Sequence, residues 1–176
     1  SIKTIFLVIL SYISGQDTFA LTFAIISGLN FGFLYYNYNP AKIYLGDCGS
    51  LFQGFTISLL LLNLEWGFDD VSIKLFAPVL LLGYTIVDTT YVTVIRTMNG
   101  NKPWIGDTNH TTHKLVKLGF SVKQTSVIVY SLTIFYCFSG ILLFILDIYY
   151  GYFILFLNII VTFYYFYTLG KVKFNA

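Results

Sequence analysis

The sequence is poor in charge, in proline and in cysteine. Its 176 residues include ten Lys and Arg, eight Asp and Glu, three prolines and two cysteines. So few charges cannot cover the surface of a soluble domain, whereas 57% of the residues are hydrophobic and the mean hydropathy is +0.76. The composition therefore predicts an integral membrane protein.

The sequence also lacks the cysteine spacing of a disulfide or zinc-binding protein and the features of a signal peptide. Cys48 lies in a polar stretch and Cys137 in an apolar run, and their spacing matches neither a disulfide framework nor a zinc site. We expect both to be structural. The apolar start has no Met, no basic n-region and no small-residue cleavage site, so it is not predicted to be a signal peptide. We expect the chain to begin inside a larger protein.

Long apolar runs alternate with short polar stretches along the chain. A helix needs about 20 apolar residues to cross the hydrocarbon, and runs such as ISLLLLNL are apolar on every side, unlike the alternating strands of outer-membrane barrels. The pattern predicts an all-α, polytopic transmembrane helix bundle of about six helices, in one integral-membrane domain of residues 1–176. The expected helices cover residues 4–14, 18–36, 49–64, 71–95, 123–146 and 150–169.

Basic residues are distributed unevenly between the loops. If the chain starts on the inside, one face collects Lys3, Lys42, Arg96, Lys102, Lys114, Lys117, Lys123, Lys171 and Lys173, leaving only Lys74 on the other. The opposite face collects Asp17, Glu65, Asp69, Asp70 and Asp147. The positive-inside rule makes the basic face cytoplasmic. We therefore predict a multi-pass protein of the inner (plasma) membrane, with an active cytoplasmic face and cytoplasmic loops at about residues 37–48 and 96–122.

The first of these loops contains the stretch NPAKIYLGDCGS, with a lone carboxylate at Asp47. The small residues around it, Gly46, Gly49 and Ser50, allow a tight turn and the close approach of a bulky ligand. A helix that begins just after Asp47 favours an anion at its N-terminus. From the residues alone, Asp47 is either the N-cap of that helix or a metal ligand.

The other chemically active side chains lie in or near the second loop. Asp88 lies within an apolar helix, where a carboxylate marks a functional site or forms a hydrogen bond to a neighbouring helix. Arg96 is either a snorkelling anchor at the interface or a phosphate clamp. His110 and His113 are spaced to share one helix face, or are ordinary surface histidines.

Two segments together resemble a known family. NPAKIYLGDCGSLFQGF is similar to the PAKIF-M-GD-x-GS-L-x-x-G signature of the polyprenyl-phosphate N-acetylhexosamine-1-phosphate transferases, in glycosyltransferase family 4. DTNHTTHKLVKLGFSVKQT resembles the family's D-x-x-H-x-H-H-[RK]-L-x-x-x-G-[FY]-S segment. The resemblance runs from about Phe31 to Gln124 and is closer to the undecaprenyl-phosphate N-acetylglucosamine-1-phosphate branch than to the pentapeptide-transferring branch.

The resemblance implies a reaction and its partners. Family members use a divalent ion, normally Mg²⁺ with Mn²⁺ as the alternative, to transfer a sugar 1-phosphate from a UDP-sugar to polyprenyl phosphate, releasing UMP. Such a reaction asks mainly for in-line positioning and charge neutralisation. The expected partners are a UDP-N-acetylhexosamine, undecaprenyl or another polyprenyl phosphate, and the membrane, but no nucleic acid; a homodimer is left open. The product would begin cell-envelope glycan synthesis.

The resemblance also implies roles for individual residues. Asp47 matches the metal-binding aspartate of the GD motif, and we take it as the metal ligand and, together with His110 and His113, as catalytic. His110 and His113 match the outer histidines of H-x-H-H, whose implied role is to hold the nucleotide-sugar phosphates. Tyr44 falls where the family has an aromatic residue beside the nucleotide base. The residues assigned to substrate binding are Asn37, Tyr44, Arg96 and Thr112.

Two departures from the family pattern bear on the activity. Thr112 replaces the middle histidine, so it keeps a hydroxyl donor but loses a titratable ring. The family's upstream acidic motifs, Asp-Asp and Asn-x-x-Asp-Gly, have no counterpart on the predicted cytoplasmic face. The chain therefore looks like the C-terminal half of a larger transferase and is expected to be inactive alone. A carrier with Asp88 and Asp47 in a cation path, and a non-catalytic membrane scaffold, are the open alternatives.

Overall fold

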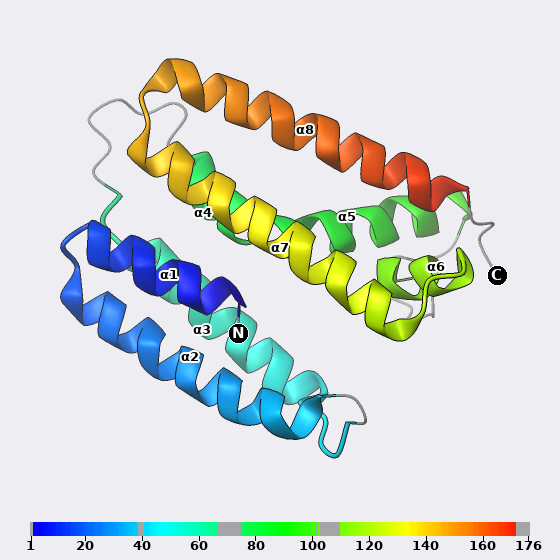
Figure 1. Ribbon diagram of the computed structural model, residues 1–176, viewed down its shortest axis with the longest axis horizontal. Helices are drawn as coiled ribbons and strands as arrows, with labels where there is room; N and C mark the ends of the chain where they lie inside the picture. Colours follow the sequence, from blue (N-terminus) through cyan, green and yellow to red (C-terminus); the bar gives the residue numbers. More distant parts are fainter. Residues whose placement is uncertain (1, 39–40, 67–74, 101, 103–109, 172–176) are drawn as a thin grey trace.

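The computed structural model describes residues 2–38, 41–66, 75–100, 102 and 110–171, and these residues form an all-helical bundle (Figure 1). The predicted fold class is confirmed. The helices in the described part are α1 (Ile2–Ile13), α2 (Asp17–Asn37), α3 (Gly46–Asn63), α4 (Phe76–Leu81), α5 (Gly83–Met98), α6 (Thr111–Lys117), α7 (Val122–Ile145) and α8 (Ile148–Gly170).

Helix α7 lies at the centre of the arrangement. It packs against α1, α4, α5, α6 and α8, while α2 covers α1 from outside. The main core joins the inner faces of these helices through buried side chains such as Leu7, Phe23, Leu81, Cys137 and Leu143. A smaller cluster of Tyr91, Leu115, Tyr165 and Leu169 joins α5, α6 and α8. This second cluster fixes α6 against the bundle.

Among the residues that the structure describes, three helices are long and apolar enough to cross a membrane, namely α2, α7 and α8, and α1 is a shorter apolar helix. Large apolar side chains on their outer surfaces, such as Leu21 and Ile25 on α2 and Phe156 and Phe163 on α8, are exposed. Lipid would cover such side chains in a bilayer. Exposed tyrosines gather near the helix ends, as in the aromatic belts of membrane proteins: Tyr35, Tyr36, Tyr38, Tyr44, Tyr164 and Tyr167 toward one end, and Tyr12, Tyr149, Tyr150 and Tyr152 toward the other.

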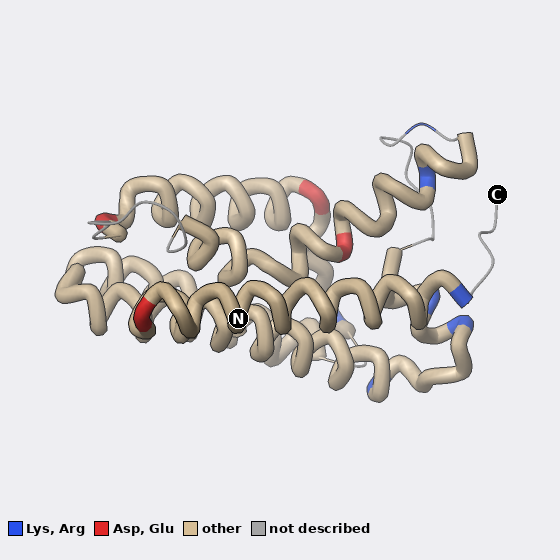
Figure 2. Tube along the Cα trace, turned by 90° about the horizontal axis from the view of Figure 1, so that it is seen from above, with Lys and Arg blue, Asp and Glu red and all other residues tan. Residues whose placement is uncertain are grey.

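Lys and Arg residues gather at one end of the molecule, where α2, α5 and α8 end and α3 and α7 begin (Figure 2). This agrees with the predicted charge asymmetry, except for the position of Lys3. Helix α1 begins about midway along the bundle, and the Lys3 ammonium donates a hydrogen bond to the Thr85 hydroxyl. Lys3 therefore lies apart from the basic end. Lys74, Asp69, Asp70 and Lys173 fall outside the described residues.

The predicted helix over residues 71–95 is two helices where the structure describes it. Helix α4 ends before Leu82, which has φ −93° and ψ 2°, and α5 begins at Gly83. A Cβ on Gly83 would lie 2.8 Å from ring atoms of Tyr136, so the absence of a side chain lets α5 approach α7 closely. Residues 71–74 are outside the described part.

Two further boundaries differ from the prediction. Helix α3 begins at Gly46, three residues earlier than expected, because Gly46 itself makes the turn with a φ of +67°. Helix α6 lies inside the predicted loop of residues 96–122. It was not expected as an element because a helix of seven residues has too short a pattern to stand out.

Helix α3 is held beside α2 at two points. At one end, the Gln16 amide donates to the Glu65 carbonyl (2.7 Å) and accepts from the Glu65 N–H (2.8 Å). Near the middle, the Gln53 amide donates to the side-chain oxygen of Asn30. The first turn of α3, which carries Asp47, projects beyond both contacts and is exposed.

Candidate functional site

Asp47 lies in the first turn of α3 with its side chain exposed. The N-cap position is Leu45, and α3 has no side-chain cap hydrogen bond, so the N-cap alternative for Asp47 is not what the structure shows. Within the part of the chain that the structure describes, the Asp47 carboxylate has no hydrogen-bond partner. Its charge is favourable at the positive end of the helix dipole, and both oxygens are available to a ligand.

The connection between α2 and α3 carries the other two residues predicted for this loop. The Asn37 amide nitrogen donates to the Ile43 carbonyl (2.8 Å), and the Lys42 N–H donates to the Tyr36 carbonyl (2.9 Å). Asn37 therefore shapes the loop, while its role toward a substrate stays a prediction. The Tyr44 ring is 81% exposed, so it is accessible for stacking against a planar ligand.

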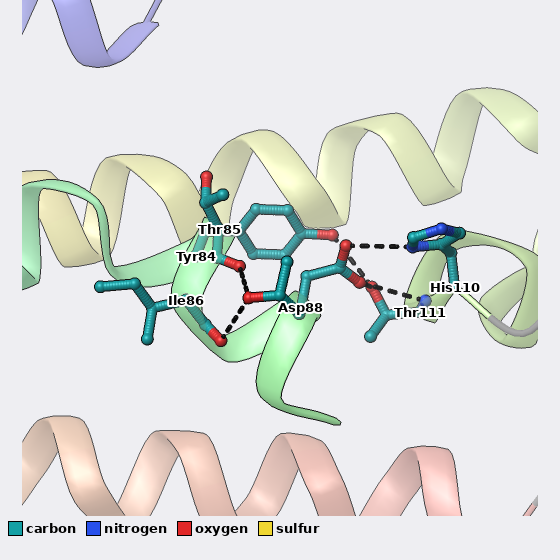
Figure 3. Close-up of polar contacts among 7 residues, drawn as sticks. Tyr84, Thr85, Ile86, Asp88, His110 and Thr111 are labelled. Atoms are coloured by element: carbon teal, nitrogen blue, oxygen red, sulfur yellow. Dashed lines mark hydrogen bonds and ion pairs between the residues drawn. The ribbon is translucent and has the colours of Figure 1, made fainter. Parts of the chain in front are cut away.

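A polar network at the other side of the basic end joins α5 to the start of α6 (Figure 3). The Asp88 carboxylate accepts from the Thr111 hydroxyl (2.6 Å) and from the Thr111 N–H (3.2 Å) through the same oxygen, Oδ1. Its other oxygen, Oδ2, lies 3.5 Å from His110 Nδ1. The Tyr84 hydroxyl lies 3.1 Å from the Thr111 hydroxyl. Of the alternatives for Asp88, the hydrogen bond to a neighbouring helix is therefore what the structure shows.

The two histidines do not share a helix face. His110 is the residue before α6 and turns toward Asp88, whereas His113 lies in the first turn of α6. Together with Thr112, His113 lines a groove of about 400 Å³ between α6 and α7, whose other lining residues include Val116, Val129 and Tyr130. The prediction from spacing is wrong here because the helix begins one residue after His110.

Two basic residues of the predicted loop are buried. Arg96, in the last turn of α5, is only 8% exposed, so it faces packed protein rather than the lipid headgroups; its role as a phosphate clamp stays a prediction. Lys114 is 2% exposed, and its ammonium donates to the Tyr91 hydroxyl (3.1 Å) and lies 5.0 Å from the ring centroid. Sequence reasoning missed the burial of Lys114, although Thr111, Lys114 and Leu115 form an i, i+3, i+4 pattern.

The predicted site residues thus form two groups at the same end of the molecule. Asn37, Tyr44 and Asp47 lie on the α2–α3 connection and the start of α3, and His110, Thr112 and His113 lie on or beside α6 (Figure 1). The described contacts tie the second group to Asp88 but do not join the two groups directly. Asp107 falls outside the described residues.

The described residues contain no group of three His, Cys, Asp or Glu side chains that could enclose a metal ion. Magnesium commonly takes only one or two carboxylates and completes its shell with substrate oxygens and water. Asp47, exposed and unpartnered among the described residues, fits such a role as a single carboxylate ligand.

Comparison with known proteins points to the same family as the two sequence motifs. The family model described as glycosyl transferase family 4 matches residues 1–65. The chain is 35% identical over 150 residues to the probable undecaprenyl-phosphate N-acetylglucosaminyl 1-phosphate transferase of Bacillus subtilis, covering 84% of this chain and 41% of that protein. It is 28% identical to the decaprenyl-phosphate N-acetylglucosaminephosphotransferase of Mycolicibacterium smegmatis, over 63% of this chain and 30% of that one.

A third relative, the undecaprenyl-phosphate alpha-N-acetylglucosaminyl 1-phosphate transferase of Salmonella typhimurium, is 29% identical over 67% of this chain and 33% of its own length. No solved structure matches the chain. The chain spans less than half the length of each of these three relatives. The resemblance seen in the two motifs is confirmed by these matches.

Proposed function

Since this chain belongs to glycosyl transferase family 4, we propose that the full-length protein transfers N-acetylhexosamine 1-phosphate from a UDP-sugar to polyprenyl phosphate, releasing UMP. The observation that carries the proposal is the exposed Asp47 carboxylate at the start of α3, at the same basic end as the histidines of α6. The names of the relatives support a sugar-phosphate transferase acting on a polyprenyl phosphate.

The reaction forms one bond and breaks one. An oxygen of the lipid phosphate attacks the phosphorus next to the sugar, the bond from that phosphorus to the UMP oxygen breaks, and UMP leaves with the electron pair. In the proposed site, His110 and His113 hold phosphate oxygens of the donor, and Tyr44 stacks on its base. Asp47 would hold Mg²⁺, which when bound offsets the negative charge of the pyrophosphate. The protein then acts mainly by positioning.

The membrane gives a reason for the location of this site. A polyprenyl phosphate carries its phosphate at the headgroup level, whereas a UDP-sugar arrives from water. The basic end of the bundle, flanked by exposed tyrosines, is where the two would meet. We propose that this end faces the cytoplasm in the inner (plasma) membrane.

The alternative of a cation carrier has less support. Both oxygens of Asp88 are directed at Thr111 and His110, so this carboxylate does not line an open path. Asp47 lies in the exposed first turn of α3 rather than within a membrane span.

The decisive test measures UMP release and lipid-linked sugar in the full-length protein across a magnesium titration. The substitution Asp47→Asn keeps the size of the side chain but removes its charge. We expect a folded protein, with its melting temperature in detergent unchanged, that loses roughly a hundredfold or more of the activity, because a neutral amide is a poor magnesium ligand.

Asp17→Asn is the matched control, because Asp17 is also an exposed carboxylate in the first turn of a helix, α2, but at the other end of the molecule. Its activity should equal that of the wild type. Near-normal activity of Asp47→Asn at ordinary magnesium would mean that Asp47 is not the metal ligand, and an absence of UMP release from the wild type would refute the proposed reaction.

A further inference from the structure

The two oxygens of the Asp88 carboxylate face different groups. Oδ1 takes both hydrogen bonds from Thr111, one from its hydroxyl and one from its backbone N–H. Oδ2 is directed at His110 Nδ1, 3.5 Å away (Figure 3). One side chain on α5 therefore contacts both the first residue of α6 and the histidine that precedes it.

The bonds to Oδ1 fix where α6 begins. Helix α6 has seven residues and no side-chain cap of its own, since the N-cap residue His110 makes no cap hydrogen bond. A helix this short is not stable by itself and depends on tertiary contacts. Asp88 supplies, from another helix, an acceptor for a free N–H group at the start of α6. The backbone at His110 is thereby held in place.

The contact to Oδ2 fixes the imidazole itself. A carboxylate beside Nδ1 favours the form of the ring with a proton on that nitrogen, and it turns the other nitrogen, Nε2, away from the carboxylate. The Asp88 side chain is 21% exposed and the His110 side chain 49%, so about half of the His110 side chain is accessible to a ligand. When the ring is protonated, Nε2–H can donate to an anionic oxygen while Nδ1–H pairs with Asp88.

We propose that Asp88 is the positioning residue for His110: it pairs with Nδ1–H and thereby orients the protonated ring with Nε2–H toward a phosphate oxygen of the nucleotide-sugar. This inference rests on the proposed function. It assigns Asp88 no contact with the substrate, because its oxygens are occupied by Thr111 and His110. A purely structural role would need only the bonds from Oδ1 to Thr111.

In the full-length protein, the substitution Asp88→Asn distinguishes the positioning of His110 from the purely structural contact with Thr111. The amide oxygen can still accept from Thr111, so we expect the melting temperature to stay within a few degrees of the wild type. The amide nitrogen, facing His110, donates rather than accepts, so the preferred proton position on the ring is reversed. A neutral ring with its proton on Nε2 can still donate to the phosphate but carries no charge, so we expect the KM for the UDP-sugar to rise about tenfold, the difference between a charge-assisted and a neutral hydrogen bond, with a smaller change in kcat.

A double-mutant cycle with His110→Ala tests whether Asp88 acts through the histidine. If it does, Asp88→Asn adds less than about twofold in KM when His110 is already alanine. Thr89→Val is the matched control, because among the described residues the Thr89 hydroxyl bonds to carbonyls of its own helix, and its loss should leave KM unchanged. A wild-type KM for Asp88→Asn, or an equal loss in the His110→Ala background, would overturn the proposal.

A second measurement does not depend on the reaction. Nuclear magnetic resonance of protein labelled with ¹⁵N-histidine reports which ring nitrogen carries the proton. We expect a protonated Nδ1 at His110 in the wild type and a neutral ring protonated at Nε2 in Asp88→Asn. Identical His110 signals in the two proteins would refute the positioning role, whether or not the transfer reaction is found. Failure of transfer with the expected change of signal would refute only the proposed function.

Discussion

At the residue scale, the histidine segment shows what a motif can and cannot specify. The motif identified His110 and His113, but their separation of three residues suggested a shared helix face. The structure places His110 before the first turn of α6 and His113 within it, so the two rings point to different surroundings. Their partner Asp88 is 23 residues distant from Thr111, and no local periodicity reports such a contact.

His113 provides a prediction at this scale. His113→Ala in the full-length protein should weaken UDP-sugar binding by one to two decades, because a charge-assisted hydrogen bond to phosphate contributes roughly 1.5 to 3 kcal/mol. Magnesium affinity should change little, since the ring is proposed to contact phosphate oxygens. Binding of the nucleotide-sugar to purified protein, by calorimetry, measures both quantities.

Thr112 offers the companion variant for this measurement. Thr112→His restores the histidine found in the family motif, and we expect equal or tighter binding of the nucleotide-sugar. If His113→Ala binds the UDP-sugar as tightly as the wild type, the α6 segment is only a surface feature of the protein.

At the scale of the element, apolar runs predicted the long helices well and the short ones poorly. The expected helices over 123–146 and 150–169 agree with α7 and α8 to within a residue or two at each end, because long apolar patterns leave little choice. The break between α4 and α5 follows no change of hydropathy. It lies beside Gly83, which packs against the ring of Tyr136 on another helix, and a contact between helices leaves no mark on local hydropathy.

The close approach at Gly83 predicts a local loss of stability. A Cβ there would lie 2.8 Å from the Cγ and Cδ1 atoms of Tyr136 and 3.0 Å from its Cβ, so Gly83→Ala forces α5 away from α7. We expect a destabilisation of about 1 to 3 kcal/mol, as for other overpacked cores. Thermal unfolding in detergent, followed by loss of helical circular dichroism, measures the effect.

Gly28→Ala in α2 is the matched control, because a Cβ there meets nothing within 4 Å. Alanine is the better helix former, so this variant should be as stable as the wild type or slightly more stable. Equal melting temperatures for both variants would show that α5 does not depend on close contact with Tyr136.

At the scale of the whole molecule, hydropathy predicted the class of helical membrane protein, and the charge asymmetry gives an orientation that stays a prediction. Hydropathy and charge asymmetry are both sums over many residues. A single residue that lies elsewhere than expected, such as Lys3 or the buried Lys114, therefore changes neither prediction. The proposed site is less predictable. It depends on how separate helices meet, and the motif residues near Asp47 and those near His110 lie on different elements.

The charge asymmetry predicts the orientation in the membrane. In a full-length background with Cys48→Ser and Cys137→Ala, a cysteine at Asp147, exposed between α7 and α8, should react with a membrane-impermeant thiol reagent in intact cells. A cysteine at Lys117, exposed at the end of α6, should react only after permeabilisation. The reverse pattern would place the candidate site on the wrong side for a UDP-sugar.

The spacing of two exposed tyrosines on α8 can be compared with the thickness of the hydrocarbon layer. Tyr150 and Tyr167 are both exposed near opposite ends of this helix, and their separation of 17 positions corresponds to about 26 Å along the axis. A typical hydrocarbon layer is about 30 Å thick. Phospholipids with shorter acyl chains would let both tyrosines reach the headgroups, while a thicker bilayer must thin around α8 or draw its basic end inward. The acyl-chain length of the surrounding lipid therefore sets how deeply the basic end lies below the headgroups.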